Sequence, residues 1–419
     1  MLKYLNYFSV SIVRIFLMPM YFLSGFTPRD EKLWVFGSWG GHRYSDNSAA
    51  FFEFCNRELD DEFTLVWISR RASIVKQLRS QGYRAHLNWS PAGVWYALRA
   101  NLHLFDCFSK DINFWTSRGA TKVCLWSGVP LKVFERSINV PGLRYYYLFH
   151  GNFITRMFLS MLMPWHVVRP DLIIAASEKS KEIIALGFDV PLRKIYTTGL
   201  PRNDQLLLPS NPHEKNLPPK VIAAIEAGQR TFMYLPTLRD KYTGQFELDW
   251  DSLNELMAEK NCQLFLKLHP VDQSNLNVNL SHISVVERSA EIYDLLPHID
   301  ALIIDYSSII WDYMLLDRPM IYFLPDHEEF INTGRAMNFD IHEHAVGAVC
   351  NNEAELTRAI AQVIEDDFPA IMQRPEYRQV CNTLNTYVDS NSAQRTLNML
   401  DAEGLYKPAT PAQEAIDCG

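Results

Sequence analysis

Residues 301–312 read ALIIDYSSIIWD, and this stretch decides the fold class. Residues 301–305 are apolar up to Asp305 and short enough for a buried strand, whereas residues 308–316 have helical spacing. Ser307 or Ser308 can cap the first turn of that helix. A buried strand that runs directly into a helix is half of a βαβ unit, from which parallel sheets are built.

The same alternation of strand and helix continues on both sides of this stretch. Apolar runs earlier in the chain predict strands at residues 33–37, 63–69, 101–107, 122–127, 172–176 and 194–198. A second series is predicted at residues 231–235, 263–268, 283–286, 301–305, 320–324 and 347–350. Amphipathic stretches predict helices at residues 47–59, 177–186, 252–260, 308–316 and 353–364, and the segment 376–405 also has a helical pattern. Two such series predict an α/β protein with two Rossmann-type, doubly wound parallel sheets.

The boundary between the two series falls in residues 207–220, LLPSNPHEKNLPPK, which are polar, proline-rich and without periodicity. We therefore expect an N-terminal domain at residues 30–206, a linker at 207–220, a C-terminal domain at 221–405 and a flexible tail at 406–419. In paired α/β domains, ligands bind at the carboxyl ends of the strands. The cleft that the two domains face is thus the expected site.

The charges are divided unevenly between the two halves of the chain. The 419 residues have a net charge of −8, which argues against a dedicated nucleic-acid-binding protein. Residues 1–205 contain 25 Lys and Arg against 16 Asp and Glu, whereas residues 206–419 contain 15 against 32. A basic first half predicts an anionic partner, such as a membrane surface. The seven cysteines form no C-x-x-C pair, so we expect a reducing compartment and no disulfide framework.

Residues 4–26 are nearly all apolar or aromatic, interrupted by Arg14 and Pro19. The apolar run after Arg14 is shorter than the ~20 residues that a membrane-spanning helix needs. Two interpretations remain, a buried first helix of the domain or a helix that lies in the membrane interface. The basic excess of the same half favours the second. We therefore expect residues 1–29 to form an apolar, membrane-associating segment.

Polar and glycine-rich motifs follow the predicted strands of the first domain. Residues 37–47, GSWGGHRYSDN, permit a tight turn before a helix that Ser45 or Asp46 can cap, and the exposed N–H groups of such a turn can bind an anion. Residues 126–132, WSGVPLK, follow a later strand, and residues 198–204, TGLPRND, end the domain. There Arg202 and Asp204 can pair in a hinge, or Arg202 can close the cleft.

A second set of motifs follows the strands of the second domain. Three strands there end in polar side chains, namely Thr237 with Arg239, then His269, then Asp305 with Ser307 and Ser308. A parallel sheet delivers these groups to one edge. Cationic groups and the free N–H groups of a helix start suit a nucleotide diphosphate, whose leaving-group charge they would stabilise. No D-x-D pair stands out, so we expect no protein-held metal and no cofactor.

With these motifs in this order, the sequence resembles the CDP-glycerol glycerophosphotransferase family, the teichoic acid primases and polymerases. The resemblance runs from about residue 35 to residue 340 and is carried by SDN at 45–47, GLPRND at 199–204, PTLR at 236–239, HP at 269–270, DYSS at 305–308 with Asp312, YFLPD at 322–326, and Arg335. It implies a GT-B-like architecture with a CDP-activated donor in the C-terminal domain. It also implies a lipid-linked acceptor in the N-terminal domain, at the cytoplasmic face of the cell membrane.

The resemblance implies a reaction as well. A hydroxyl of a lipid-linked glycan or polyol phosphate would attack the β-phosphorus of CDP-glycerol and release CMP. The residues expected to act are His269, Asp46 and His150 in catalysis, Arg239, Thr237, Ser307, Ser308, Asp305, Arg202 and Asp312 on the donor, and Ser127, Lys132 and Asn47 on the acceptor side.

One position departs from the pattern of that family. Its members carry Trp-His-Gly-Thr-Pro-Leu-Lys, in which the histidine is regarded as the base, whereas this chain has Ser127 in its place. A serine hydroxyl cannot hold a transferred proton near neutral pH. Either His42, Asp46 or His150 is the base, or the transfer needs little base catalysis, or the protein has changed. Such a change would be a CDP-ribitol or nucleotide-sugar donor, or a non-catalytic role in a polymer synthesis complex.

Overall fold

The computed structural model describes residues 2–59, 62–141, 144–213, 217–237, 248–268, 276, 278–333, 336–365 and 375–407. Of residues 2–12, 144, 332 and 333 it describes the backbone alone. Arg239, His269, Arg335 and residues 408–419 lie outside the described residues, so what the sequence predicts for them stays a prediction.

The first half of the chain forms a parallel sheet whose strands run in the order β3-β2-β1-β4-β5-β6-β7. Its strands are β1 (Asp30–Gly37), β2 (Thr64–Ser69), β3 (Ala85–Leu87), β4 (Ala100–Phe105), β5 (Thr121–Cys124), β6 (Leu172–Ala175) and β7 (Ile195–Thr197). Strand β1 pairs with β2 on one side and with β4 on the other. The chain thus winds outward from β1 in both directions, as in a doubly wound fold.

The second half repeats this winding in a sheet of order β10-β9-β8-β11-β12-β13. Its strands are β8 (Arg230–Leu235), β9 (Cys262–Leu266), β10 (Ile283–Val285), β11 (Ala301–Ile304), β12 (Met320–Phe323) and β13 (Ala348–Cys350). Every pairing in both sheets is parallel. The two parallel sheets that the sequence predicts are therefore confirmed.

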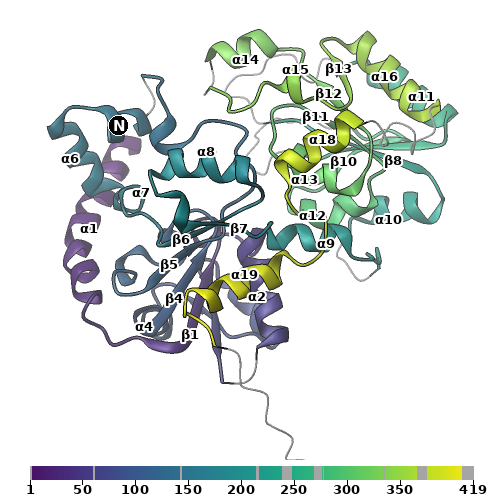
Figure 1. Ribbon diagram of the computed structural model, residues 1–419. Helices are drawn as coiled ribbons and strands as arrows, with labels where there is room; N and C mark the ends of the chain where they lie inside the picture. Colours follow the sequence, from purple (N-terminus) through teal and green to yellow (C-terminus); the bar gives the residue numbers. More distant parts are fainter. Residues whose placement is uncertain are drawn as a thin grey trace, which may run out of the picture.

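Helices cover the sheets, as the ribbon in Figure 1 shows. Around the first sheet and in the connection they are α1 (Leu2–Ser24), α2 (Asp46–Glu58), α3 (Ala72–Ser80), α4 (Pro91–Arg99), α5 (Arg144–His150), α6 (Phe153–Leu162), α7 (Pro164–Val167), α8 (Glu178–Phe188), α9 (Asp204–Leu207) and α10 (Pro219–Glu226). In the rest of the chain they are α11 (Trp250–Glu259), α12 (Ile292–Leu295), α13 (Ile309–Tyr313), α14 (His327–Thr333), α15 (Ile341–His344), α16 (Glu353–Glu365), α18 (Pro375–Leu384) and α19 (Ser392–Ala402). Parallel strands covered on both faces are apolar throughout, and Trp34, Val35 and Phe36 of β1 are fully buried.

The last helix crosses back to the first half of the chain. The Asp204 carboxylate accepts hydrogen bonds from the backbone N–H groups of Ser392 (2.9 Å) and Ala393 (2.8 Å), which begin α19. Arg395 Nε donates to the carbonyl oxygen of Thr198 (2.8 Å). In Figure 1, α19 lies beside α2 and the first sheet. The predicted domain 221–405 assigns α19 to the second half of the chain. Its hydrogen bonds to Asp204 and Thr198, however, lie with the first half. The domain boundaries stay predictions.

The apolar N-terminal segment is one long helix, α1. Arg14 Nη1 donates to the carbonyl oxygen of Leu162 (2.8 Å), and the Tyr21 ring stacks on Phe114 with centroids 4.6 Å apart. Helix α1 therefore packs on the first half of the protein through one of its faces. None of the helices in the described ranges combines the length and the hydropathy that crossing a bilayer requires.

Candidate functional site

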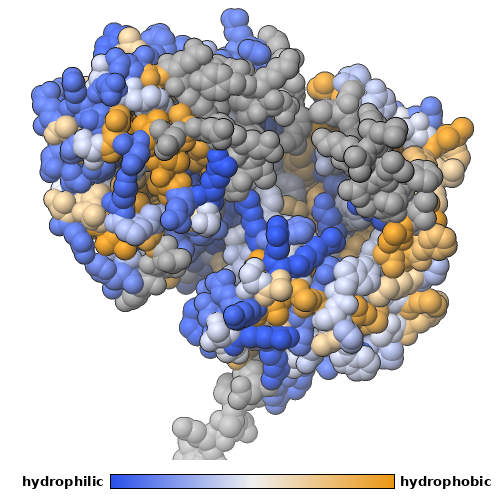
Figure 2. Space-filling model, turned by 180° about the vertical axis from the view of Figure 1, so that it is seen from behind, coloured by the Kyte–Doolittle hydropathy of each residue, from blue (hydrophilic) through white to orange (hydrophobic). Residues whose placement is uncertain are grey.

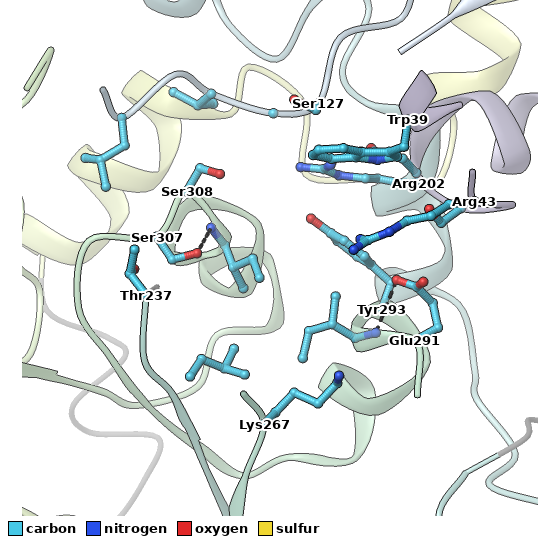
Figure 3. Close-up of a pocket in the computed structure, with 18 of the residues that line it drawn as sticks. Trp39, Arg43, Ser127, Arg202, Thr237, Lys267, Glu291, Tyr293, Ser307 and Ser308 are labelled. Carbon is cyan, nitrogen blue, oxygen red and sulfur yellow. Dashed lines mark hydrogen bonds and ion pairs between the residues drawn. The ribbon is translucent and has the colours of Figure 1, made fainter. Parts of the chain in front are cut away.

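A cleft of about 850 Å³ lies where the carboxyl ends of strands from both sheets meet. Figure 3 shows residues that line it. Of the residues predicted for the site, the structure brings together Asp46, Ser127, Lys132 and Arg202 from the first half with Thr237, Ser307 and Ser308 from the second. These predicted residues come from loops that follow β1, β5, β7, β8 and β11. These residues thus lie at the carboxyl ends of the strands, where the sequence predicts them, and their role in a site stays a prediction.

Arg202 joins the two halves at the wall of this cleft. Its Nη1 donates to Oδ1 of Asp46 (2.5 Å), and its Nη2 donates to Oδ2 of Asp312 (2.7 Å). Its guanidinium lies 4.7 Å from the ring centre of Tyr293, whose hydroxyl donates to Oδ2 of Asp312 (2.6 Å). We name Asp46, Arg202, Tyr293 and Asp312 the Arg202 cluster. The side chains of its Asp46, Arg202 and Asp312 are 6%, 4% and 0% exposed.

In the Arg202 cluster one guanidinium is shared by two carboxylates. Burial works to lower the pKa of Arg202, but the carboxylates of Asp312 and Asp46 outweigh it and hold that pKa well above its usual value. Asp312 does not line the cleft, so the predicted contact of Asp312 with the donor does not fit its position. The predicted hinge pairing of Arg202 with Asp204 is also wrong, because the Asp204 carboxylate instead caps α19. Arg202 therefore holds the halves together.

The loop with Ser127 is fixed by a buried asparagine. Asn47 Nδ2 donates to the carbonyl oxygens of Leu125 (3.1 Å) and Trp126 (2.7 Å), and its Oδ1 accepts from the backbone N–H of Arg202 (3.1 Å). Asn47 is fully buried, so the predicted contact of Asn47 with the acceptor is corrected to a supporting role. Gly128 follows with a φ of +127°, and a Cβ there would lie 2.6 Å from Nη2 of Arg202. Only glycine lets this loop approach Arg202 so closely.

Asp305 holds the loop that follows β8. Its carboxylate accepts hydrogen bonds from the backbone N–H of Thr237 (2.9 Å) and from the Thr237 hydroxyl (2.5 Å). Asp305 itself is buried, so it supports the loop from the interior of the protein.

The cap predicted for the next helix, α13, is weaker than expected. Ser308 occupies the N-cap position of α13 without a side-chain bond, and the Ser307 hydroxyl accepts from the N–H of Ile309 at 3.4 Å. Both serines line the cleft.

The glycine-rich turn after β1 forms a short 3₁₀ helix, η1 (Trp39–Gly41), in a left-handed conformation. Trp39 has a φ of +46° and Asp46 a φ of +68°. The turn is held by the Asp111 carboxylate, which accepts from the N–H of Gly40 (2.7 Å). Trp39 Nε1 donates to Oδ2 of Asp46 (3.0 Å). The cap predicted for Ser45 is absent, since its side chain makes no cap hydrogen bond. The Asp46 side chain instead accepts from the N–H of Asn47.

A second contact joins the halves through the segment that follows Ser127. The N–H of Val133 donates to the carbonyl oxygen of Ala336 (2.8 Å), and the N–H of Asn338 donates to that of Leu131 (2.8 Å). Lys132 Nζ lies 4.6 Å from the ring centre of Phe330 on α14. The predicted acceptor-side residue Lys132 is thus tied to the second half of the chain.

Comparison with known proteins shows the family to which this chain belongs. The family model of the CDP-Glycerol:Poly(glycerophosphate) glycerophosphotransferases matches residues 19–401, which is most of the chain. The chain belongs to this family. It is 27% identical over 376 residues to a teichoic acid poly(glycerol phosphate) polymerase of Bacillus spizizenii, covering 85% of this chain and 90% of that relative. It is 24% identical over 376 residues to a teichoic acid glycerol-phosphate transferase of Staphylococcus aureus, covering 87% and 92%.

The fold of this glycerophosphotransferase is similar to a solved structure as well. The wall teichoic acid polymerase TagF superposes with a TM-score of 0.72 at 18% identity, covering 96% of this chain and 97% of that chain. At this identity the likeness concerns the fold. The α/β architecture with parallel sheets, similar to that of the polymerase, agrees with the one that the sequence resemblance implies.

The histidines considered as bases do not line the cleft of this glycerophosphotransferase. Among the described residues His150 and His42 are both exposed, and Nε2 of His150 hydrogen-bonds the carbonyl oxygen of Arg136 (3.0 Å). Asp46 does line the cleft, but both of its oxygens already accept hydrogen bonds in the Arg202 cluster and its surroundings. Within the same described residues, no group of three or more His, Cys, Asp or Glu could hold a metal ion.

Sequence reasoning missed four charged residues that line the cleft of the glycerophosphotransferase: Arg43, Lys267, Arg288 and Glu291. Lys267 Nζ donates to the carbonyl oxygen of Arg288 (3.0 Å). Burial lowers the pKa of Lys267, with Glu291 opposing this and the cations Arg43 and Arg288 adding to it. The signal for Lys267 was its place just before the predicted His269, at the end of a strand. The other three lie on loops, where periodicity carries no information.

Proposed function

We propose that this glycerophosphotransferase transfers glycerol phosphate from CDP-glycerol to a hydroxyl group of a lipid-linked glycan or polyol-phosphate acceptor. The acceptor oxygen forms a bond to the β-phosphorus, the bond from that phosphorus to the bridging oxygen breaks, and CMP leaves. The acceptor proton is lost to solvent or buffer. The observation that carries this proposal is the cleft of about 850 Å³ between the two sheets, in a member of this family.

The second half of the chain offers the groups that a diphosphate needs. Ser307 and Ser308 present hydroxyl and N–H groups at the start of α13, and Lys267 adds a positive charge in the same cleft. Thr237, held by Asp305, forms the neighbouring wall. We propose that Arg239 and His269 complete this set from the same edge of the sheet, as the sequence predicts. These donors would stabilise the charge that develops on the leaving CMP.

Ser127 at the position of the family histidine favours a transfer that rests on positioning and charge stabilisation. Transfer of a phosphoryl group draws most of its acceleration from those two effects. No imidazole of the described residues lines the cleft, and Asp46 is occupied by Arg202. We propose that the protein orients the acceptor hydroxyl between Ser127 and Lys132.

The donor is tested by following CMP release from CDP-glycerol with extracted lipid-linked acceptor. We expect the wild type to release CMP, and His269→Ala to lose at least about 100-fold in rate, because the diphosphate loses a donor near the breaking bond. His282→Ala is the matched control. Its imidazole precedes β10, at the amino end of the same sheet, and bonds the Cys262 carbonyl oxygen. No release by the wild type, or release from CDP-ribitol alone, contradicts the proposal.

We further propose that the protein acts as a peripheral protein on the cytoplasmic face of the cell membrane, where its lipid-linked acceptor would lie. Helices α1 and α6 contact each other and carry large apolar side chains that are mostly exposed, including Phe16 (78%), Leu23 (67%) and Phe153 (79%). Figure 2, seen from behind, shows hydrophobic residues gathered on the side where α1 and α6 lie. Arg14, the charge that interrupts the apolar segment, turns inward to Leu162 and Trp165. The outer face is thereby left apolar, and it belongs to the basic half of the chain.

The membrane proposal is tested by sedimentation with vesicles that contain anionic lipid. We expect the double variant Phe16→Gln/Phe153→Gln to lose at least about tenfold in vesicle affinity, because each inserted phenylalanine contributes roughly 1.5–3 kcal/mol when fully buried. Leu186→Gln on α8 is the matched control, since Leu186 is 71% exposed but distant in sequence from both helices. Equal sedimentation of the double variant and the wild type would reject α1 and α6 as the contact.

A further inference from the structure

The side of the cleft away from the serines is formed by an aromatic ring and charged groups. Figure 3 shows Trp39, Arg43 and Glu291 on the opposite side of the cavity from Ser307 and Ser308. A nucleotide diphosphate whose phosphates lie at the serines would extend its base toward that side. We name Trp39, Arg43 and Glu291 the base-side residues.

Glu291 holds a carboxylate in a fixed position. Its Oε1 accepts from the N–H of Ile292 (3.1 Å), so the side chain is anchored at the start of α12. Burial and the neighbouring carboxylates of Asp46 and Asp294 raise the pKa of Glu291, whereas Arg43 opposes this rise. The negative charge of this carboxylate is only partly balanced by its surroundings. A hydrogen bond donated by a ligand N–H would therefore stabilise it.

Trp39 presents its ring from a backbone that is held under strain. Its φ of +46° is unusual for a tryptophan, and such a conformation persists only where the surroundings fix it. Here the fixing contacts are the hydrogen bond from its indole to Asp46 and the bond from Gly40 to Asp111. The side chain nevertheless stays 43% exposed, with the Arg43 guanidinium 5.4 Å from its ring centre. Planar groups of this kind are the surfaces on which nucleobases stack.

We propose that Glu291 selects the base of the donor by accepting a hydrogen bond from the exocyclic amine of cytosine, while Trp39 and Arg43 supply the planar surface beside that base. This inference rests on the proposed CDP-linked donor. Cytosine offers an amine at its position 4, whereas uracil has a carbonyl oxygen there. That oxygen would face the Glu291 carboxylate with no proton between them, so a uridine nucleotide would be rejected.

Titration calorimetry with CDP and UDP tests this selection without the need for an acceptor. We expect the wild type to bind CDP at least about tenfold more tightly than UDP. Loss of a hydrogen bond to a charged group typically weakens binding by at least that factor. In Glu291→Gln the ratio should fall to within about threefold, because the amide can donate to the uracil oxygen as well as accept from the cytosine amine. Glu287→Gln is the matched control, an exposed glutamate of the same loop that does not line the cleft.

The outcomes separate this inference from the donor proposal. A wild type that binds neither nucleotide contradicts the CDP-linked donor, and the base selection falls with it. A wild type that prefers CDP, with the preference unchanged in Glu291→Gln, overturns the selection by Glu291 and leaves the donor intact. The inference is likewise overturned if Glu291→Gln retains the preference but loses CMP release through kcat alone, since Glu291 would then act on the reacting atoms. Circular dichroism of each variant verifies that it folds.

Discussion

Replacement of Arg202 by methionine is expected to lower the free energy of unfolding by about 3–5 kcal/mol, the usual effect of removing one partner from a buried ion pair. The carboxylates of Asp46 and Asp312 would remain in the interior with no cation between them. The same change should abolish CMP release, because Arg202 joins Asp46 in the first half of the cleft to Asp312 on α13. Methionine keeps most of the volume, so the effect reports the lost charge.

Urea denaturation of the wild type, Arg202→Met and Arg378→Met measures this difference. Arg378 pairs with Asp317 at 2.8 Å, but both side chains are about half exposed. An exposed pair contributes at most about 1 kcal/mol, so Arg378→Met should unfold close to the wild type. A denaturation midpoint of Arg202→Met equal to that of Arg378→Met would show that the Arg202 cluster does not stabilise the protein.

Asp305→Ala is expected to reduce the rate of CMP release about 100-fold, a typical result when groups that position a substrate shift by about 1 Å. Without the carboxylate, the N–H and hydroxyl of Thr237 lose the acceptor that fixes the loop after β8. Asp305 is buried and acts through Thr237, so it is a positioning residue. We expect kcat to fall more than KM rises, and Asp305→Asn, which keeps an acceptor oxygen, to recover part of the rate.

The other end of the same two strands supplies the control for this variant. Asp300 precedes β11, and its carboxylate accepts from the N–H of Thr231 (2.9 Å) in β8. Asp300→Ala therefore removes an equivalent hydrogen bond from the amino end of the sheet, far along the strands from the cleft. Steady-state kinetics of Asp300→Ala should match the wild type. If both aspartate variants lose activity equally, the loss comes from stability rather than from the loop.

Much of the architecture could be predicted, because buried parallel strands appear in the sequence as short, continuous apolar runs. Each predicted strand has a counterpart in the part of the chain that the structure describes, where β3, which was not predicted, is only three residues long. The segment predicted as helical at 376–405 proved to be two helices, α18 and α19. Several helices were not predicted, among them α3, α4, α5, α6 and α7. Helix α6 buries none of its residues, so its apolar side chains do not mark an inner face.

The candidate site was predictable by position and less so by role. The order of motifs along the chain placed Asp46, Ser127, Thr237 and Ser307 at one cleft, because the carboxyl ends of parallel strands share an edge. Which side chains face the cleft depends on packing between the halves, which no local pattern records. Asn47 and Asp312, although part of the same motifs as Asp46 and Ser308, turn into the interior instead.

The return of α19 to the first half has a consequence for how the protein comes apart. One hydrophobic cluster includes Trp34 and Leu104 of the first sheet, Leu302 of the second, and Leu397 of α19, so the two halves share a continuous hydrophobic core there. The chain thus crosses between the two halves twice, once in the proline-rich residues 207–220 and once in the segment before α19. A protease that cuts the proline-rich connection would leave them associated, and heating should melt both in a single cooperative transition.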